Sequence, residues 1–222
     1  MTLYHGPSLV TDGLVMYLDA ANPRSYPGSG ATLTDLSINK YTGTLINSPT
    51  FSSINQGGLV FNPVSSQYCT TTLGGWPSDF TLEVAINTSS VSSKQTVTGN
   101  YSGAAGGGLE ITAGAQWNFF VWNSGGVYAA VTVGTLSTST NYIVTCTKLG
   151  TAMTLYQNSQ KLGTATLTSS VINQSQPVYI AKDYAQSLYY NGTVYYVKIY
   201  SRALSQAEIT QNFNSLRYRY GI

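Results

Sequence analysis

Charged residues are scarce in this chain of 222 residues. Only 8% of its residues are Asp, Glu, Lys or Arg, against roughly 25% in an average soluble domain. The net charge of +2 gives no electrostatic basis for binding nucleic acid or a membrane surface. The polar surface must therefore consist of Ser, Thr, Asn, Gln and Gly. With many Tyr, Thr and Val residues, such a composition favours strands and turns over helices.

Histidine, cysteine and long apolar runs are rare as well. The one histidine, His5, lies near the N-terminus, which nearly excludes a Ser–His–Asp triad. Cys69 and Cys146 have no cluster of His or Lys around them, and we predict reduced, packed thiols, with a disulfide as the alternative. No window approaches 18 uninterrupted apolar residues, so no membrane span is predicted. We also expect no secretory signal, because no basic segment is followed by an apolar one at the N-terminus.

About a dozen short strands follow one another at a spacing of 8–12 residues, which is typical of a β-sandwich or barrel. The clearest is 80–87, where Phe80, Leu82, Val84 and Ile86 alternate with polar or small residues and predict a strand with one core face. The segment 88–108 is rich in Ser and Gly, and we predict a surface loop there. We expect residues 1–12 to form a short N-terminal arm and 13–222 to form one domain.

The C-terminal segment predicts a strand followed by a helix. Residues 194–200 form a dense apolar and aromatic run. Ser205 and Glu208 have the spacing of a capping box, which predicts a helix that begins at Gln206. Ile209, Phe213 and Leu216 then lie on one helical stripe, so the helix is expected to pack its apolar face against a β-sheet.

Several segments, in order along nearly the whole chain, resemble one known family. They are GLVMYLDAANPRSYPGSG (13–30), DLSINKYTGTLINSPTFSS (35–53), LVFNPVSSQYCTT (59–71), DFTLEVAIN (79–87), MTLYQNSQKLGT (153–164) and the ending from residue 191. Together they resemble the concanavalin A-like jelly-roll domains of the laminin-G type. The resemblance implies an all-β jelly-roll β-sandwich with one short C-terminal α-helix, in which the first and last strands are neighbours and the helix closes the sandwich behind them.

The opening VTDGLVMYLDAANPRSYPGSG and the ending QNFNSLRYRYGI look like the variant of this family that is common in structural proteins of tailed bacteriophages. This resemblance implies a virion protein, such as an exterior capsid decoration or a tail or fibre component, present in multiple copies. Its partners would be other virion proteins, contacted through one face or through the N-terminal arm. The outward loops would remain free to contact glycans on the host surface.

Enzymatic chemistry finds little support in the sequence. A glycosidase needs two carboxylates close together, and none of the eight acidic residues falls in an E-x-D-x-E-like alternation on one strand. Glu83 is the one acid within a strongly predicted strand. We favour a structural role for it, with a polar partner across the sheet, over a catalytic one.

Calcium is disfavoured, and no other cofactor is expected. Members of the family that bind Ca²⁺ use carboxylates on a rim loop, and Ca²⁺ wants six to eight oxygen ligands. The family's acidic stretch is replaced here by 62–66, which contains no acid. Asp19 and Asp35 remain, but Asp35 is equally suited to holding a turn.

Two aromatic regions are candidate binding sites. In QWNFFVW, Trp117, Phe119 and Val121 share one strand face, whereas Phe120 and Trp122 share the other. An exposed aromatic face would suit a sugar ring, which makes Trp122, Asn123 and Tyr128 candidate glycan contacts. The alternative, which we favour from the pattern, is that both faces are covered. Tyr184, Tyr189 and Tyr190 form a second aromatic segment that is suited to a protein partner.

We therefore predict a non-enzymatic virion structural protein that acts through protein–protein contacts. The first alternative is a carbohydrate-binding module or adhesin that uses Trp122 and Tyr128. The second is a glycoside hydrolase of the same fold that uses Glu83.

Overall fold

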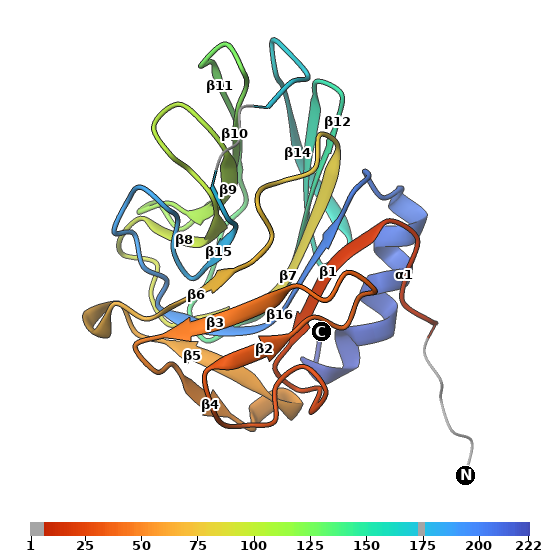
Figure 1. Cartoon of the computed structure of the whole chain (residues 1–222). Helices are drawn as coiled ribbons and strands as arrows, with labels where there is room; N and C mark the ends of the chain where they lie inside the picture. Colours follow the sequence, from red (N-terminus) through yellow and green to blue (C-terminus); the bar gives the residue numbers. More distant parts are fainter. Residues whose placement is uncertain (1–6, 173–175) are drawn as a thin grey trace.

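The computed structural model describes residues 7–172 and 176–222, and over these ranges the chain folds into two antiparallel sheets packed face to face (Figure 1). The predicted fold class, an all-β jelly-roll sandwich with one short C-terminal helix, is confirmed. None of the described helices is long and apolar enough to cross a membrane.

Sheet A has the strand order β14-β13-β12-β7-β16-β5-β4, with β1 also paired to β16. The first and last strands of the domain are therefore neighbours, as predicted. The strands of sheet A are β1 (Leu14–Asp19), β4 (Thr50–Ser52), β5 (Gly58–Phe61), β7 (Phe80–Thr88), β12 (Asn141–Leu149), β13 (Ala152–Gln157), β14 (Gln160–Thr166) and β16 (Gly192–Tyr200).

Sheet B has the strand order β11-β10-β9-β8-β15-β6-β3-β2. Its strands are β2 (Thr32–Thr34), β3 (Thr42–Ile46), β6 (Tyr68–Thr71), β8 (Gln95–Gly99), β9 (Gly107–Ile111), β10 (Trp117–Trp122), β11 (Tyr128–Val133) and β15 (Tyr179–Ile180). Short 3-10 turns lie at η1 (Ile54–Gln56), η2 (Pro63–Ser65) and η3 (Arg217–Arg219).

The core lies between the sheets, where alternate residues of facing strands point inward. Both cysteines belong to it: Cys69 lies on β6 of sheet B and Cys146 on β12 of sheet A, and both are free thiols, as predicted. Burial raises the pKa of the Cys69 thiol to about 12. Buried, protonated thiols of this kind act as packing residues rather than nucleophiles.

The prediction of a surface loop over 88–108 is wrong in its central part. Residues 95–99 form β8, a fully buried strand between β9 and β15. Its composition is polar, but the polar groups are satisfied: the Thr98 hydroxyl donates to the Tyr179 carbonyl oxygen at 2.8 Å. A Thr- and Gly-rich strand can be buried when its hydroxyls have hydrogen-bond acceptors. Such a strand has no apolar periodicity from which it could be predicted.

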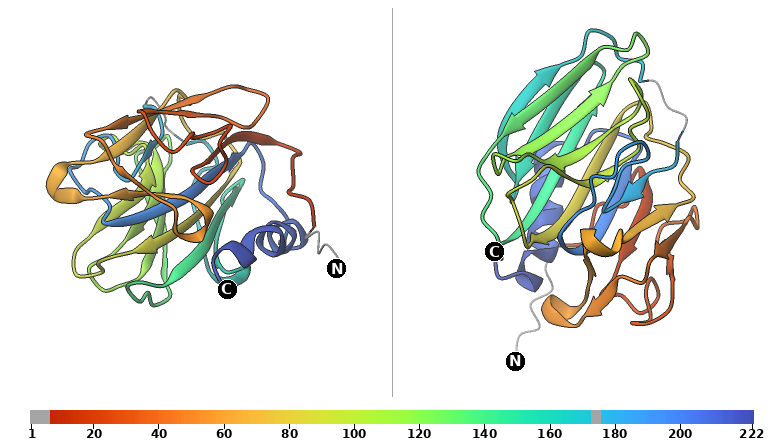
Figure 2. Two further views of the ribbon diagram at one scale, coloured as in Figure 1. Left: turned by 90° about the horizontal axis from the view of Figure 1, so that it is seen from below. Right: turned by 90° about the vertical axis from the view of Figure 1, so that its left-hand side faces the viewer.

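Strand β7 also differs from its prediction, because both of its faces are buried. Phe80, Leu82, Val84 and Ile86 point into the core between the sheets. Ala85 and Glu83 point the other way and are fully buried as well. The second face is covered because the C-terminal helix α1 (Gln206–Leu216) lies on the outer side of sheet A (Figure 2).

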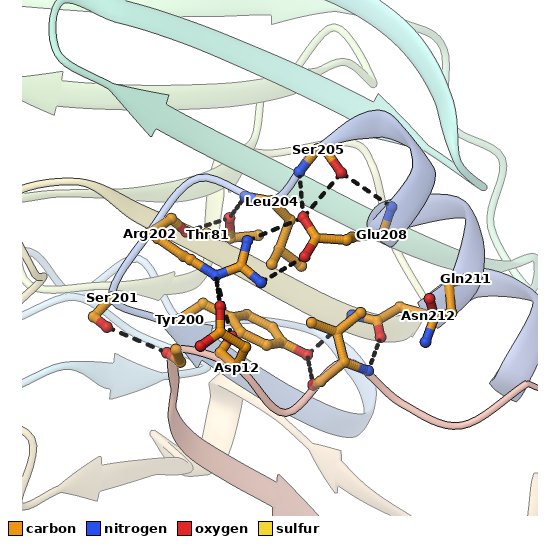
Figure 3. A network of polar contacts seen from close by, with 12 residues as sticks. Asp12, Thr81, Tyr200, Ser201, Arg202, Leu204, Ser205, Glu208, Gln211 and Asn212 are labelled. Carbon is orange, nitrogen blue, oxygen red and sulfur yellow. Dashed lines mark hydrogen bonds and ion pairs between the residues drawn. The ribbon is translucent and has the colours of Figure 1, made fainter.

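Helix α1 begins with the predicted capping box. The Ser205 hydroxyl accepts from the Glu208 backbone N–H at 3.4 Å, and the Glu208 carboxylate accepts from the Ser205 N–H at 2.8 Å (Figure 3). Of the predicted apolar stripe, Ile209 is buried, whereas Phe213 and Leu216 are half-buried at the edge of the contact. The other fully buried residue of the helix is the polar Asn212, which the apolar pattern did not single out.

Asn212 reaches a buried ion pair on the sheet beneath it. Lys198 Nζ on β16 lies 2.8 Å from Glu83 Oε1 on β7, and neither side chain is exposed. The Tyr196 hydroxyl donates to the same oxygen at 2.9 Å, and Asn212 Nδ2 donates to the second carboxylate oxygen at 3.1 Å. The predicted cross-sheet partner of Glu83 is therefore Lys198. The pKa of Lys198 is lowered by burial, although Glu83 favours its charged form.

The same asparagine holds the N-terminal segment. Its Oδ1 accepts from the Val10 backbone N–H at 2.9 Å, and Tyr200 donates its hydroxyl to the Val10 carbonyl at 3.1 Å (Figure 3). Gln211 Nε2 donates to the Ser8 carbonyl at 2.7 Å. Residues 8–10 of the predicted arm thus contact their own chain. Residues 1–6 lie outside the described residues.

We predict that Lys198→Met lowers the free energy of unfolding by about 3–5 kcal/mol, because it leaves the Glu83 carboxylate buried without its cation. Urea denaturation measures the change. Asp12→Ala is the matched control: it removes an ion pair to Arg202 in which the aspartate side chain is 85% exposed, and we expect a cost of at most about 1 kcal/mol. Equal costs for the two variants would contradict the prediction.

Candidate functional site

The face of sheet B that points away from the core carries a cluster of aromatic rings. Along β10 the side chains alternate: Trp117, Phe119 and Val121 enter the core and are fully buried, whereas Asn118, Phe120 and Trp122 point outward. The pairing of β10 with β11 sets Trp122 directly opposite Tyr128. The alternation of one strand therefore supplies both core and outer surface.

The outward rings form the wall of a cleft of about 280 Å³. The ring centroids of Trp122 and Tyr128 are 5.3 Å apart, and Tyr101 lies 6.1 Å from both Phe120 and Trp122. Tyr128 is 45% exposed, whereas Phe120 is only 3% exposed. The cleft is lined by Lys94, Tyr101, Glu110, Phe120, Trp122, Tyr128 and Gln186, and we call it the Trp122 cleft.

Glycines on the adjoining strand allow this close arrangement. Gly108 of β9 pairs with Phe120, and a Cβ atom at Gly108 would lie 2.4 Å from the Thr98 carbonyl oxygen of β8. Only glycine fits there without moving a backbone. The glycine-rich composition of 103–108 thus brings β8 and β9 together directly beneath the aromatic rings.

Polar groups line the same cleft. Glu110 of β9 is nearly buried, and its Oε2 accepts from Asn118 Nδ2 at 2.8 Å and lies 3.0 Å from Lys94 Nζ. Asn118 Oδ1 in turn accepts from the Thr132 hydroxyl at 2.8 Å. The carboxylate and amide are therefore held rigidly, while the Lys94 side chain remains 46% exposed. The cleft presents a fixed carboxylate, a partly exposed ammonium group and flat apolar surfaces.

A second carboxylate lies close behind the cleft. Asp183 is fully buried, and its Oδ1 accepts from the Gln186 backbone N–H. Burial raises the pKa of Asp183 to about 6, and the negative charge of Glu110 adds to the rise. The two acids are 73 positions apart in the sequence, so only the fold brings them into electrostatic contact. No pattern within a single strand indicates such a pair.

The three glycan candidates from the sequence have different positions. Trp122 and Tyr128 line the Trp122 cleft, and their role in binding stays a prediction. Asn123 does not line it, because it is only 1% exposed. Its Oδ1 accepts from the backbone N–H groups of Gly125 and Val127, and its Nδ2 donates to the Thr168 hydroxyl. Asn123 holds the β10–β11 turn and is not available to a sugar.

The three tyrosines predicted to contact a protein partner also differ in their exposure to solvent. Tyr190 is fully buried in the core, so it cannot contact a partner. Tyr189 is half-buried and Tyr184 is 45% exposed, both on the outer face of sheet B near β6 and β15. Tyr68 and Tyr179, which the sequence did not single out, join them there.

The acids considered for calcium are engaged within the chain. Asp19 accepts two hydrogen bonds from Arg219, at 2.8 and 3.0 Å. Asp35 accepts from the backbone N–H groups of Tyr17 and Ser37, both at 2.8 Å, so it holds a turn as expected. Within residues 7–172 and 176–222, no group of three His, Cys, Asp or Glu side chains is placed to hold a metal ion.

A larger, open depression of about 750 Å³ lies at one end of the sandwich, between residues 74–79 and 170–172. The one carboxylate among its described lining residues, Asp79, accepts from the Gly150 N–H at 2.7 Å and pairs with Lys148. Its aromatic residue, Trp76, is 4% exposed. The depression therefore offers no aromatic platform, and the Trp122 cleft is the better candidate site.

The fold and cleft define a lectin-like jelly-roll domain, and comparison with family models agrees. Residues 64–210 match the model described as the concanavalin A-like lectin/glucanases superfamily, Laminin_G_3. The chain belongs to this family. A search of curated proteins finds none that matches this chain.

Solved structures show the same fold at low sequence identity. Trypanosoma rangeli sialidase in complex with sialic acid aligns with a TM-score of 0.72 at 18% identity, over 96% of this chain and 35% of the sialidase. The binding domain of botulinum neurotoxin serotype D aligns with a TM-score of 0.72 at 15% identity, over 92% of this chain and 52% of that one. The chain thus spans about a third of the length of the sialidases it resembles.

We predict that Asp183→Asn stabilises the protein at pH 7.5 but not at pH 4. The folded-state pKa of Asp183 lies above its unfolded value, so the stability gained by holding the proton is present below about pH 4 and is lost as pH rises to about 6. The expected gain at pH 7.5 is roughly 1–3 kcal/mol. Urea denaturation at both pH values tests this, and an equal change at both would contradict it.

Proposed function

We propose that this chain is a non-catalytic glycan-binding domain whose sugar site is the Trp122 cleft. The observation that carries the proposal is that accessible aromatic rings, exposed at Tyr128 and half-buried at Trp122 and Tyr101, line one cleft with polar groups. Aromatic faces pack against the apolar face of a sugar ring, and Glu110, Lys94 and Gln186 line the same cleft as hydrogen-bonding partners for sugar hydroxyls. Membership of a family described by lectins and glucanases supports the same ligand class.

Two observations support a binding rather than a catalytic role. Glu83, the acid that the sequence offered as a candidate, is buried beneath α1 with Lys198 and cannot contact a substrate. Glu110 does line the cleft, but Asp183, the acid with which it interacts electrostatically, is fully buried. Most glycosidases need two carboxylates at the glycosidic bond.

We further propose the setting that the sequence resemblance implies, the exterior of a bacteriophage particle, with other virion proteins as partners. The two stretches that carry the phage resemblance come together in the fold, where Val10 binds Asn212 and Asp19 pairs with Arg219. They lie on the side of sheet A, whereas the Trp122 cleft lies on the outer face of sheet B. A chain attached through the sheet A side would present the cleft outward. Co-purification with intact particles, at a fixed copy number, tests this setting.

We expect Trp122→Ala to weaken glycan binding at least about tenfold, because it removes the central ring of the cleft. A glycan array read with the wild type and the variant measures the effect. Tyr218→Ala is the matched control: Tyr218 is 59% exposed on η3, away from sheet B. No binding of the wild type to any glycan, or equal loss in both variants, would refute the assignment of the cleft.

Glu110→Gln distinguishes binding from catalysis. It keeps the size of the side chain and one oxygen acceptor, so we expect sugar binding to weaken by less than in Trp122→Ala. We expect no glycan hydrolysis by either the wild type or the variant. Hydrolysis by the wild type that disappears in Glu110→Gln would overturn the non-catalytic proposal.

A further inference from the structure

Lys182 lies among several tyrosine rings on the outer face of sheet B. Its Nζ is 4.8 Å from the ring centroid of Tyr68, 5.5 Å from that of Tyr189 and 5.9 Å from that of Tyr179. The Tyr184 ring lies a further step out, 6.1 Å from Tyr179. These residues come from β6, β15 and the segment after β15, and we call them the Lys182 cluster.

The charge of Lys182 is not neutralised. In the described part of the chain, no ion pair includes Lys182, whereas the fully buried lysines Lys148 and Lys198 each have a carboxylate partner. Aromatic rings attract a cation but carry no net charge. Lys182 is also half-buried, so water screens its charge less than it would at a fully exposed site. The cluster is therefore a positively charged, flat aromatic surface.

The tyrosine hydroxyls add hydrogen-bond donors. Burial raises the pKa of Tyr68, and the neighbouring Tyr179 and Tyr189 add to the rise, so this hydroxyl stays protonated at neutral pH. A cation beside protonated hydroxyls and flat rings has the features that an anionic sugar needs: a charge partner, donors and an apolar platform.

The Lys182 cluster adjoins the Trp122 cleft. The Ala185 backbone N–H donates to the Tyr101 carbonyl at 3.0 Å, and Tyr101 is a wall of the cleft. Gln186, one residue on, lines the cleft itself, whereas Tyr184, one residue back, belongs to the cluster. One short segment thus separates the two surfaces. The cleft's own cation, Lys94, is already paired with Glu110, so the uncompensated positive charge lies on the side of Lys182.

We propose that the Lys182 cluster is a second subsite, which binds an anionic sugar unit of the same glycan whose neighbouring unit lies in the Trp122 cleft. The inference rests on the proposed glycan-binding function and specifies its ligand class: an acidic oligosaccharide. The anionic group is a carboxylate or a sulfate ester, since an ammonium group binds either.

The test is an array on which each carboxylated glycan is printed beside its carboxyl-reduced form, and each sulfated glycan beside its desulfated form. We expect the wild type to prefer one or both acidic classes by about tenfold, the effect of one charge-assisted hydrogen bond. Lys182→Met, which keeps the packing of the aliphatic stem, should bind both forms equally. Lys161→Met, an exposed lysine on β14 of sheet A, is the matched control and should keep the preference.

The outcomes separate this inference from the proposed function. Preference for carboxylated glycans alone, or for sulfated glycans alone, supports the subsite and identifies its anion. If the wild type binds neutral and acidic forms equally well, and Trp122→Ala loses this binding, the result would support the cleft and overturn the subsite. A preference that survives Lys182→Met would overturn it too. Binding to no glycan at all would overturn both. Unchanged thermal unfolding of each variant shows that the fold is intact.

Discussion

The buried ion pair between Glu83 and Lys198 is the interaction on which the rest of the fold depends. Two charges withdrawn from water are tolerated only when every remaining hydrogen-bonding position is filled. Tyr196 and Asn212 donate to the carboxylate, and the ammonium group lies over the rings of Tyr17 and Tyr196. Asn212 in turn binds Val10. The pair therefore fixes the register of the two central strands of sheet A. Through Asn212 it also fixes the positions of the C-terminal helix and of the N-terminal segment. Segments from both ends of the chain meet at Asn212, which binds this carboxylate.

This arrangement decides where function can lie. Sheet A is covered by sheet B on one side and, over its central strands, by α1 on the other. Among the described residues no α-helix lies on the outer face of sheet B, and aromatic rings and polar groups of that face form the Trp122 cleft and the Lys182 cluster. Charges are scarce in this chain, and most are paired within it. The few that remain free in the fold are consequently informative, and Lys182 is half-buried among aromatic rings that cannot neutralise it.

Much of the fold could be predicted from local pattern. The alternation of β7 and the capping box of Ser205 and Glu208 depend on neighbours in sequence, and the structure confirms the strand and the cap, although the second face of β7 is buried as well. Strand β8 was missed because Thr and Gly lack the apolar period, although their hydroxyls and bare backbones suit a buried position. Asn123 and Tyr190 were assigned to the surface because aromatic and amide residues beside a turn suit either burial or exposure, and their sequence context does not choose between them.

By itself, the sequence determined the class of structure: period-two apolar runs, turn residues and a single capped helix are properties of short segments. It also limited histidine to one position, His5. Only the tertiary structure decided which residues meet. Glu110 and Asp183, Glu83 and Asn212, and Lys182 and Tyr68 are each separated by more than seventy positions, and strand order alone brings them together. Sites in a β-sandwich arise from such pairings across strands, because neighbours along a strand point to opposite faces.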